Sequence, residues 1–101
     1  MTKPIQFSYE EDISDLFDDG TVYSFYYSMV STCAPLFNEM YDNYEVADCL
    51  KKAGVINEEC SEDSESCGLG VYFDSEVKAK GFIKRLNEFL VGRASKLNKG
   101  D

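Results

Sequence analysis

The strongest constraint on the fold of this chain is an apolar stripe that runs through its C-terminal quarter. Between residues 75 and 94, apolar side chains recur every three or four positions, as they do along the buried face of an α-helix. The stripe consists of Val77, Ala79, Phe82, Ile83, Leu86, Phe89, Leu90 and Ala94. We therefore expect a helix over 75–92, with Glu76 favourably placed in its first turn.

The rest of the chain must cover this stripe within one domain, because 101 residues are far fewer than the roughly 250 at which cores divide. We expect a single compact domain over 1–101, with 1–6 and 95–101 as frayed tails. No apolar run approaches the ~18 residues of a membrane span. The first residues also lack the apolar segment of a signal peptide. We therefore expect a cytoplasmic protein with no membrane contact.

A second helix is predicted near the N-terminus. Ser8 and Glu11 have the spacing of a capping box, in which a serine caps the helix and a glutamate follows three residues later. Helical spacing then continues through Tyr9, Ile13, Leu16 and Phe17. Gly20 is suited to the position just after the helix. These signals predict a helix over 9–19.

The segment 21–33 fits two templates. Read as a helix, its apolar face contains Val22, Phe25, Tyr26, Met29, Val30 and Cys33. Read as a strand, it alternates Tyr23, Phe25, Tyr27 and Met29 onto one face, in agreement with its β-branched and aromatic content. Because the strand would leave three large apolar residues on the solvent face, the periodicity favours a helix. The alternative is a strand over 22–31 that pairs with 68–73.

The remaining segments complete an α+β, helix-dominated fold of three to four helices packed with one short strand or small sheet. Apolar spacing predicts one or two helices over 35–53, starting at Pro35, with a cap at Asp42 or Asn43 for a second helix and a stop at Gly54. The acidic segment 57–67 has no large apolar side chain and is predicted to be an exposed loop. Residues 68–73 are predicted to form a strand, whose glycines suggest an edge, a bulge or a close backbone contact. Its partner would be 22–31 or Val55–Ile56.

The composition removes several functional classes. The chain has no histidine, so it lacks the Ser-His and Cys-His nucleophile pairs and the imidazole metal ligand. Its net charge of −9 opposes direct binding to nucleic-acid phosphates. The charge is also segregated, since residues 1–76 carry a net −14 and residues 77–101 a net +5. We expect a non-catalytic acidic module without a cofactor or metal.

The four cysteines are expected to be reduced, because no export signal accompanies them. Cys33 and Cys49 lie on predicted apolar helical faces and are interpreted as core residues. Cys60 and Cys67 flank an acidic segment, where a labile disulfide is the alternative. No C-x-x-C motif is present, which leaves a zinc site built from four scattered thiolates as a minor alternative.

Two ladders of carboxylates are the candidate partner-binding residues. The first is Glu11, Asp15, Asp18 and Asp19, and the second is Glu39, Asp42, Glu45 and Asp48, with Tyr41 and Tyr44 between its members. Steps of three and four residues rise about 4.5 and 6 Å along a helix. Phosphates of one DNA strand advance about 3.4 Å per nucleotide. Carboxylates at this spacing therefore imitate a phosphate track approximately, although solubility alone also explains exposed acids.

In size and charge the chain resembles the small acidic inhibitors that bacteriophages encode, including anti-CRISPR and DNA-mimic proteins. The two ladders, the acids from Glu58 to Glu65 and the absence of catalytic groups carry this resemblance. It implies a viral protein, acting in the host cytoplasm, that occupies the basic nucleic-acid channel of an enzyme. The basic C-terminal helix departs from uniformly acidic mimics, which restricts the mimicry to one face.

Two other functions remain as alternatives. The first is a structural or assembly module, for example a homodimer joined through an aromatic face that contains Tyr23, Phe25 and Tyr27. The second, weaker alternative is a small enzyme or metal protein that uses the cysteines. The first hypothesis requires a basic protein surface as partner, and the assembly hypothesis requires a second copy of the chain.

Overall fold

The computed structural model describes residues 5–17 and 20–99. In this part of the chain, four helices accompany a four-stranded antiparallel sheet in the order β1-β2-β4-β3. The elements are α1 (Tyr9–Asp12), β1 (Ser14–Asp15), β2 (Tyr23–Tyr27), α2 (Met29–Thr32), α3 (Asn43–Lys52), β3 (Ser61–Glu62), β4 (Leu69–Phe73) and α4 (Glu76–Lys99). The predicted α+β class is confirmed, and the sheet is larger than one short strand.

The central pair of the sheet is β2 with β4, and it corrects the prediction of a helix over 21–33. Phe25 lies opposite Val71, and both side chains are fully buried. Tyr26, on the other face of the strand, is 48% exposed. The helix in this region is confined to α2. The strand alternative, with pairing to 68–73, is the arrangement in the structure, because β4 supplies the backbone partner that β2 needs.

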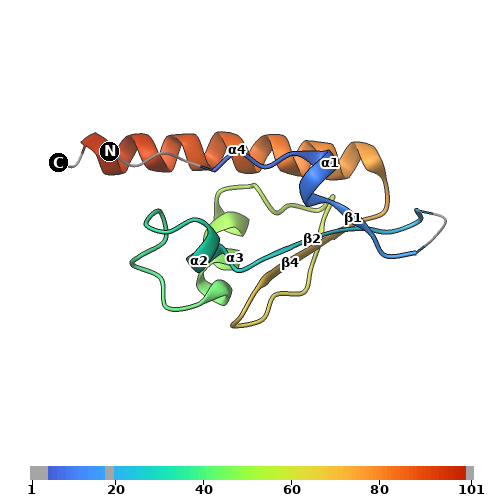
Figure 1. The fold of residues 1–101 in the computed structure, drawn as a ribbon, viewed down its shortest axis with the longest axis horizontal. Coiled ribbons are helices and arrows are strands. Elements are labelled where there is room, and N and C mark those ends of the chain that lie inside the picture. The colour runs from blue at the N-terminus through green and yellow to red at the C-terminus, as the bar shows by residue number, and fades with distance from the viewer. Residues whose placement is uncertain (1–4, 18–19, 100–101) are drawn as a thin grey trace.

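α4 packs across one face of this sheet and provides much of the core (Figure 1). The Phe82 ring lies 5.2 Å from the ring of Phe25 and 5.2 Å from that of Phe73, measured between centroids. The predicted C-terminal helix is confirmed. It continues beyond residue 92 to Lys99, so 95–99 is helical rather than a frayed tail.

The N-terminal helix is much shorter than the predicted 9–19. Ser8 caps α1 as expected, since its Oγ accepts a hydrogen bond from the Glu11 N–H at 3.2 Å. The helix ends at Asp12, and the chain then enters β1, where Ser14 lies opposite Ser24. Pairing with β2 therefore replaces the last helical turns. Asp18 and Asp19 lie outside the described residues.

The predicted helix over 35–53 is also shortened, to α3. The segment 33–39 forms successive turns, so no helix starts at Pro35. Asp42 is the N-cap as predicted, since its Oδ1 accepts hydrogen bonds from the N–H groups of Tyr44 and Glu45 at 3.0 and 3.2 Å. Gly54 follows the last turn with φ +80°, a conformation that glycine adopts readily, which confirms the predicted stop.

The acidic segment 57–67 is not only a loop. It contains β3, which pairs with β4 and forms a hairpin that we call the acidic hairpin (residues 61–72). The Asp63 N–H donates to the carbonyl oxygen of Gly70 at 2.9 Å. A Cβ atom on Gly70 would lie 2.7 Å from the Asp63 backbone oxygen, and one on Gly68 would lie 2.3 Å from Cζ of the Tyr26 ring. The predicted close backbone approach is confirmed at Gly70, whereas Gly68 is approached by the Tyr26 side chain.

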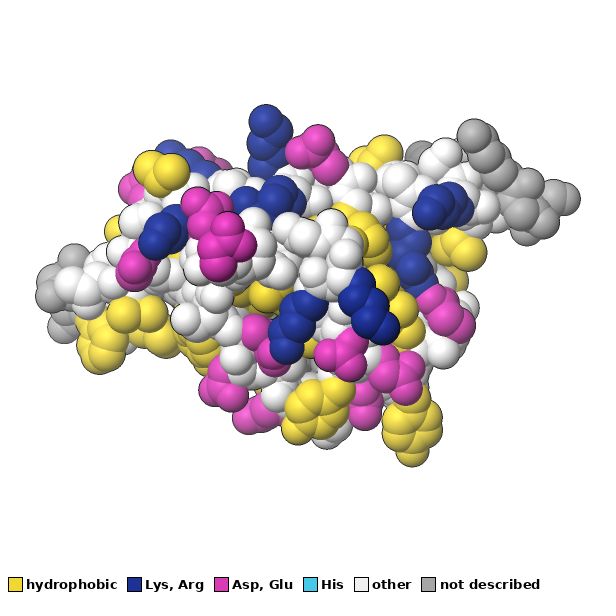
Figure 2. Space-filling view, turned by 180° about the vertical axis from the view of Figure 1, so that it is seen from behind, with side chains coloured by type: hydrophobic (Ala, Val, Ile, Leu, Met, Phe, Trp, Pro, Cys, Tyr) yellow, Lys and Arg dark blue, Asp and Glu magenta, His cyan; other side chains and the backbone are white. Residues whose placement is uncertain are grey.

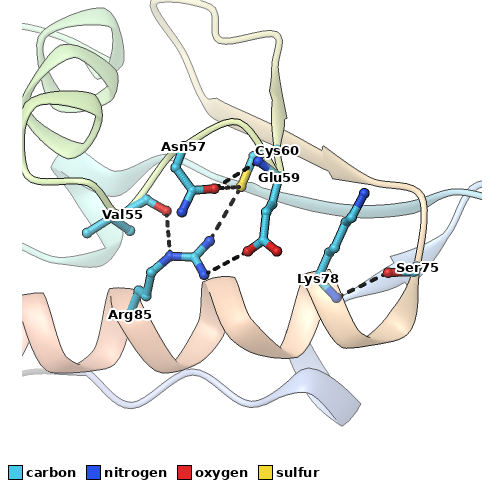
Figure 3. Close-up of polar contacts among 7 residues, drawn as sticks. All are labelled: Val55, Asn57, Glu59, Cys60, Ser75, Lys78 and Arg85. Carbon is cyan, nitrogen blue, oxygen red and sulfur yellow. Dashed lines mark hydrogen bonds and ion pairs between the residues drawn. The ribbon is translucent and has the colours of Figure 1, made fainter.

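Arg85 of α4 holds the segment that leads into this hairpin (Figure 3). Its guanidinium donates to the Val55 carbonyl at 3.1 Å, contacts the Cys60 thiol at 3.7 Å and pairs with the Glu59 carboxylate at 3.5 Å. All four cysteines are free thiols, so Cys60 and Cys67 do not form the alternative disulfide. Cys33 is buried as predicted, whereas Cys49 is only half-buried.

A candidate acidic docking face

The start of α3 is positioned by Asn43, a fully buried polar residue. Its side-chain oxygen accepts hydrogen bonds from the N–H groups of Met29 and Val30, at 2.7 and 3.2 Å. These groups belong to the first turn of α2, where N–H donors have no partner within the helix. The Asn43 amide donates to the Ser66 carbonyl at 3.0 Å. One side chain thus joins α2, α3 and the acidic hairpin.

Two tyrosines project from the surface beside this junction. Tyr41 is 89% exposed and Tyr44 is 52% exposed. The Tyr41 N–H donates to Oε2 of Glu45 at 3.0 Å, which fixes the Tyr41 backbone against the first turn of α3. Exposed tyrosines are favoured anchors of protein–protein interfaces, because a large rigid ring is buried at little entropic cost.

An open hollow of about 490 Å³ lies along the same side of α3. Its lining residues are Glu39, Met40, Glu45, Asp48, Cys49 and Lys52. Met40 and Cys49 contribute its apolar surface, the three carboxylates its negative charge, and Lys52 a single cation. The hollow can therefore take a side chain that is partly apolar and carries a positive charge.

The carboxylates of this region differ in how fully they are already engaged. Glu39 pairs with Arg93, whose guanidinium also lies over the Phe37 ring at 4.8 Å from its centroid. Asp42 is occupied as the cap of α3. Glu45 uses Oε2 for the Tyr41 N–H, and the Asp48 side chain makes no hydrogen bond or ion pair with any residue that the structure describes. Glu45 and Asp48 are thus the carboxylates best placed to accept a partner.

The acidic hairpin lies beside α3 and extends the negative surface. Lys51 of α3 pairs with Glu62 of β3 at 2.5 Å, and this hydrogen-bonded pair lowers the pKa of the Glu62 carboxyl. The second link is Asn43 to Ser66, near the other end of α3. Asp63 and Glu65, both exposed, lie between these links in the chain. The acids of 58–65 were noted in the sequence, but their position beside α3 depends on the β3–β4 pairing, which was not predicted.

We define the acidic face by the residues that α3 and the hairpin bring together. They are Glu39, Tyr41, Asp42, Tyr44, Glu45, Asp48, Asp63 and Glu65. Figure 2 shows carboxylates gathered along the edge of the molecule opposite α4, with hydrophobic side chains projecting among them. At the border of this face, the Tyr26 hydroxyl lies 3.2 Å from Glu65 and 3.5 Å from the Cys67 thiol, and these contacts raise the pKa of the Tyr26 phenol.

The first predicted ladder does not belong to this face. Glu11 lies in α1 and Asp15 in β1, so they do not share one side of a helix. β1 forms the edge of the sheet opposite β3, whereas the acidic face lies on the β3 side. The helical spacing that would align these acids ends at Asp12, so Glu11 and Asp15 do not form the predicted helical ladder. Their binding to a partner stays a prediction. Asp18 and Asp19 lie outside the described residues.

Of the predicted aromatic dimer face, Phe25 belongs to the core, and Tyr23 and Tyr27 are partly buried against it. Phe25 is fully buried, and its ring lies 5.2 Å from the rings of both Phe7 and Tyr27. Tyr23 packs against Tyr9 at 6.2 Å between centroids. The N-terminal segment and α4 thus cover the side of β2 that was predicted to receive a second copy.

Comparison of the chain with protein-family models, curated proteins and solved structures finds no match in any of the three. Among residues 5–17 and 20–99, no group of three or more acidic or cysteine side chains is arranged to hold a metal ion. Within the same residues, no helix has the length and apolar character needed to cross a membrane.

Proposed function

We propose that this protein is a non-catalytic acidic module that inhibits a nucleic-acid-binding enzyme by occupying its basic groove. The observation that carries the proposal is the juxtaposition of α3 with the acidic hairpin, which gathers carboxylates from two separate segments around two exposed tyrosines. A surface of this composition is complementary to a groove lined with lysine and arginine.

The position of the lysine and arginine side chains of α4 supports the proposal that the acidic face binds a basic groove. Four cationic side chains of α4 have partners within the protein: Lys78 with Asp74, Lys80 with Glu76, Arg85 with Glu59 and Arg93 with Glu39. These pairs compensate much of the basic charge of the C-terminal helix. The acidic face therefore dominates the electrostatic field on its side of the molecule and can steer a basic partner toward it.

The spacing on α3 supports nucleic-acid mimicry as the form of inhibition. Glu45 and Asp48 lie three residues apart, a rise of about 4.5 Å along the helix axis, compared with about 3.4 Å between phosphates of one DNA strand. The hairpin adds Asp63 and Glu65, which lie in the chain between the two contacts that hold the hairpin to α3. Because the row on α3 is short, we expect it to match a few phosphates of a groove and not a long track.

The test is affinity capture from a nuclease-treated lysate with three baits. The first bait is the unaltered protein, the second carries Glu45→Lys and Asp48→Lys, and the control carries Glu11→Lys and Asp15→Lys. The two variants change the net charge equally, one on α3 and the other on α1 and β1. Bound proteins are released with a 24-base-pair DNA duplex and identified.

We expect nucleic-acid enzymes to be retained by the unaltered and control baits, lost from the α3 variant and released by the duplex. Retention of the same proteins by all three baits would contradict the proposed face. Loss from the control bait alone would place the binding surface at α1 and β1 instead.

A further inference from the structure

The side of α4 that faces away from the sheet carries a repeat of its own (Figure 1). Residues on this side recur in alternating steps of four and three, the heptad spacing that aligns side chains along one line of a helix for packing against a second helix. They are Val77, Gly81, Lys84, Glu88, Val91 and Ser95, and we call this line the outer seam. Val77 was counted in the buried stripe from its spacing, but it is 80% exposed in the structure.

The middle of the outer seam carries two charged side chains that are not used within the protein. Neither Lys84 nor Glu88 makes a side-chain hydrogen bond or an ion pair with any residue that the structure describes. By contrast, Lys80 of the same helix pairs with Glu76 at 2.7 Å. In that pair the acid precedes the lysine by four residues, whereas Lys84 precedes Glu88, which is the less favourable order within one helix. Lys84 and Glu88 are therefore available for charges on another molecule.

The charges of the outer seam match those of a second copy only when the two helices run in opposite directions. In an antiparallel pair centred between residues 84 and 88, Lys84 of each copy faces Glu88 of the other, so two-fold symmetry makes this contact twice. In a parallel pair each lysine would face a lysine and each glutamate a glutamate, which like-charge repulsion disfavours. The charge order therefore selects the antiparallel arrangement.

The side-chain sizes along the outer seam match in the same register. On one side of the centre Val91, which is 51% exposed, faces Gly81 of the second copy. Further out, the exposed Val77 faces the small side chain of Ser95. Each valine thus meets a position with little or no side chain, as a knob that enters a hole. Both valines lose their contact with water in this pair, which favours association.

We propose that the outer seam of α4 joins two copies of this chain as an antiparallel helix pair, with Lys84 of each copy against Glu88 of the other at the two-fold axis. The seam from Val77 to Ser95 is about 27 Å long, and its apolar side chains are the two valines, so we expect a weak, concentration-dependent dimer. The inference does not depend on the proposed function. The acidic face lies along the side of the molecule opposite α4 (Figure 2), so the dimer leaves both acidic faces free.

Sedimentation equilibrium at rising protein concentration measures the dimer dissociation constant of the unaltered protein and of four variants. Lys84→Glu and Glu88→Lys each place like charges face to face, and the double variant Lys84→Glu/Glu88→Lys restores opposite charges in the antiparallel register. Lys96→Glu is the matched control, since it makes the same charge change at an exposed position of α4 outside the outer seam. Gly81 is left unaltered, because a Cβ atom there would lie 3.2 Å from Nη1 of Arg85. Circular dichroism verifies that each variant is folded.

We expect the unaltered protein to dimerise at high micromolar concentration, and each single charge reversal in the outer seam to raise the dissociation constant at least about tenfold. The double variant and the Lys96→Glu control should dimerise like the unaltered protein. An equimolar mixture of the Lys84→Glu and Glu88→Lys variants should form a heterodimer at concentrations where neither variant dimerises alone.

A protein that stays monomeric at high micromolar concentration would overturn the proposal. So would a dimer that Lys96→Glu weakens as much as Lys84→Glu does, because the effect would then come from net charge and not from the outer seam. A dimer that the single variants weaken and the double variant does not restore would overturn the antiparallel register.

Discussion

At the scale of single residues, Asn43 is the side chain on which the geometry of the acidic face depends most. We predict that Asn43→Ala lowers the free energy of unfolding by about 2–4 kcal/mol, because it leaves the N–H groups of Met29 and Val30 and the Ser66 carbonyl without their side-chain partner. Urea unfolding measures this loss. Asn38→Ala is the control, since Asn38 is exposed, and it should change the stability by less than about 0.5 kcal/mol.

Cys33 gives a second prediction at this scale. Burial raises the pKa of its thiol from 9.0 to about 11. The folded protein therefore holds the proton more tightly than the unfolded chain. The resulting stability is fully present below pH 9 and is lost as the pH rises toward 11, by at most about 3 kcal/mol.

Unfolding measured at several pH values between 8 and 11 tests this effect. Cys33→Ala should be less stable than the unaltered protein at pH 8, and the difference should shrink as the pH rises. A difference that stays constant over this range would show that the thiol does not titrate differently in the two states. Tyrosines with raised pKa values, such as Tyr27, contribute equally to both proteins and cancel in the comparison.

At the scale of elements, the β3–β4 pairing positions Asp63 and Glu65 of the acidic face, and Gly70 permits this pairing. We predict that Gly70→Ala destabilises the protein by about 1–3 kcal/mol, because its Cβ would lie 2.7 Å from a backbone oxygen of Asp63. Gly92→Ala, in α4, should stabilise it by up to about 1 kcal/mol, since no atom lies within 4 Å of the new Cβ. Thermal unfolding of the two variants should shift in opposite directions, and shifts of the same sign would contradict this packing.

The elements that could be predicted from the sequence are those whose signals are local. The apolar stripe of α4, the cap at Ser8, the cap at Asp42 and the stop at Gly54 all depend on residues within a turn or two of one another. The segment 21–33 was wrongly assigned because Tyr26 was counted on a buried helical face. In the structure its ring lies over Gly68 of a distant segment and remains half-exposed. Helical periodicity is read within one segment, so it gives no information about a contact with a distant segment.

Only the part of the candidate site that lies on or next to α3 could be predicted from the sequence. Tyr44, Glu45 and Asp48 were identified from a helical spacing that α3 keeps, whereas Tyr41 lies just before the N-cap of α3. The position of the hairpin acids depends on strand pairing and on Asn43, whose buried role no local pattern indicates. Conversely, the helical ladder through Asp15 does not form, because pairing of β1 with β2 at Ser14 and Asp15 replaces the helix predicted there.

At the scale of the whole molecule, the segregation of charge along the chain becomes a segregation in space. The basic helix α4 lies along one side and contacts acids from several segments, while the acidic face lies along the other (Figures 1 and 2). Because exposed charges are screened within about 10 Å at 0.1 M salt, we expect binding of a basic partner through this face to weaken steadily as the salt concentration rises.

The central claim is that the acidic face takes the place of nucleic acid in an enzyme groove. Steady-state kinetics of an enzyme captured by the protein test it most directly, with the nucleic-acid substrate varied at several fixed concentrations of inhibitor. We predict that the apparent KM for the nucleic acid rises with inhibitor while kcat stays unchanged, and that Glu45→Lys/Asp48→Lys abolishes the effect. A fall in kcat at constant KM, or equal inhibition by the variant, would contradict this account.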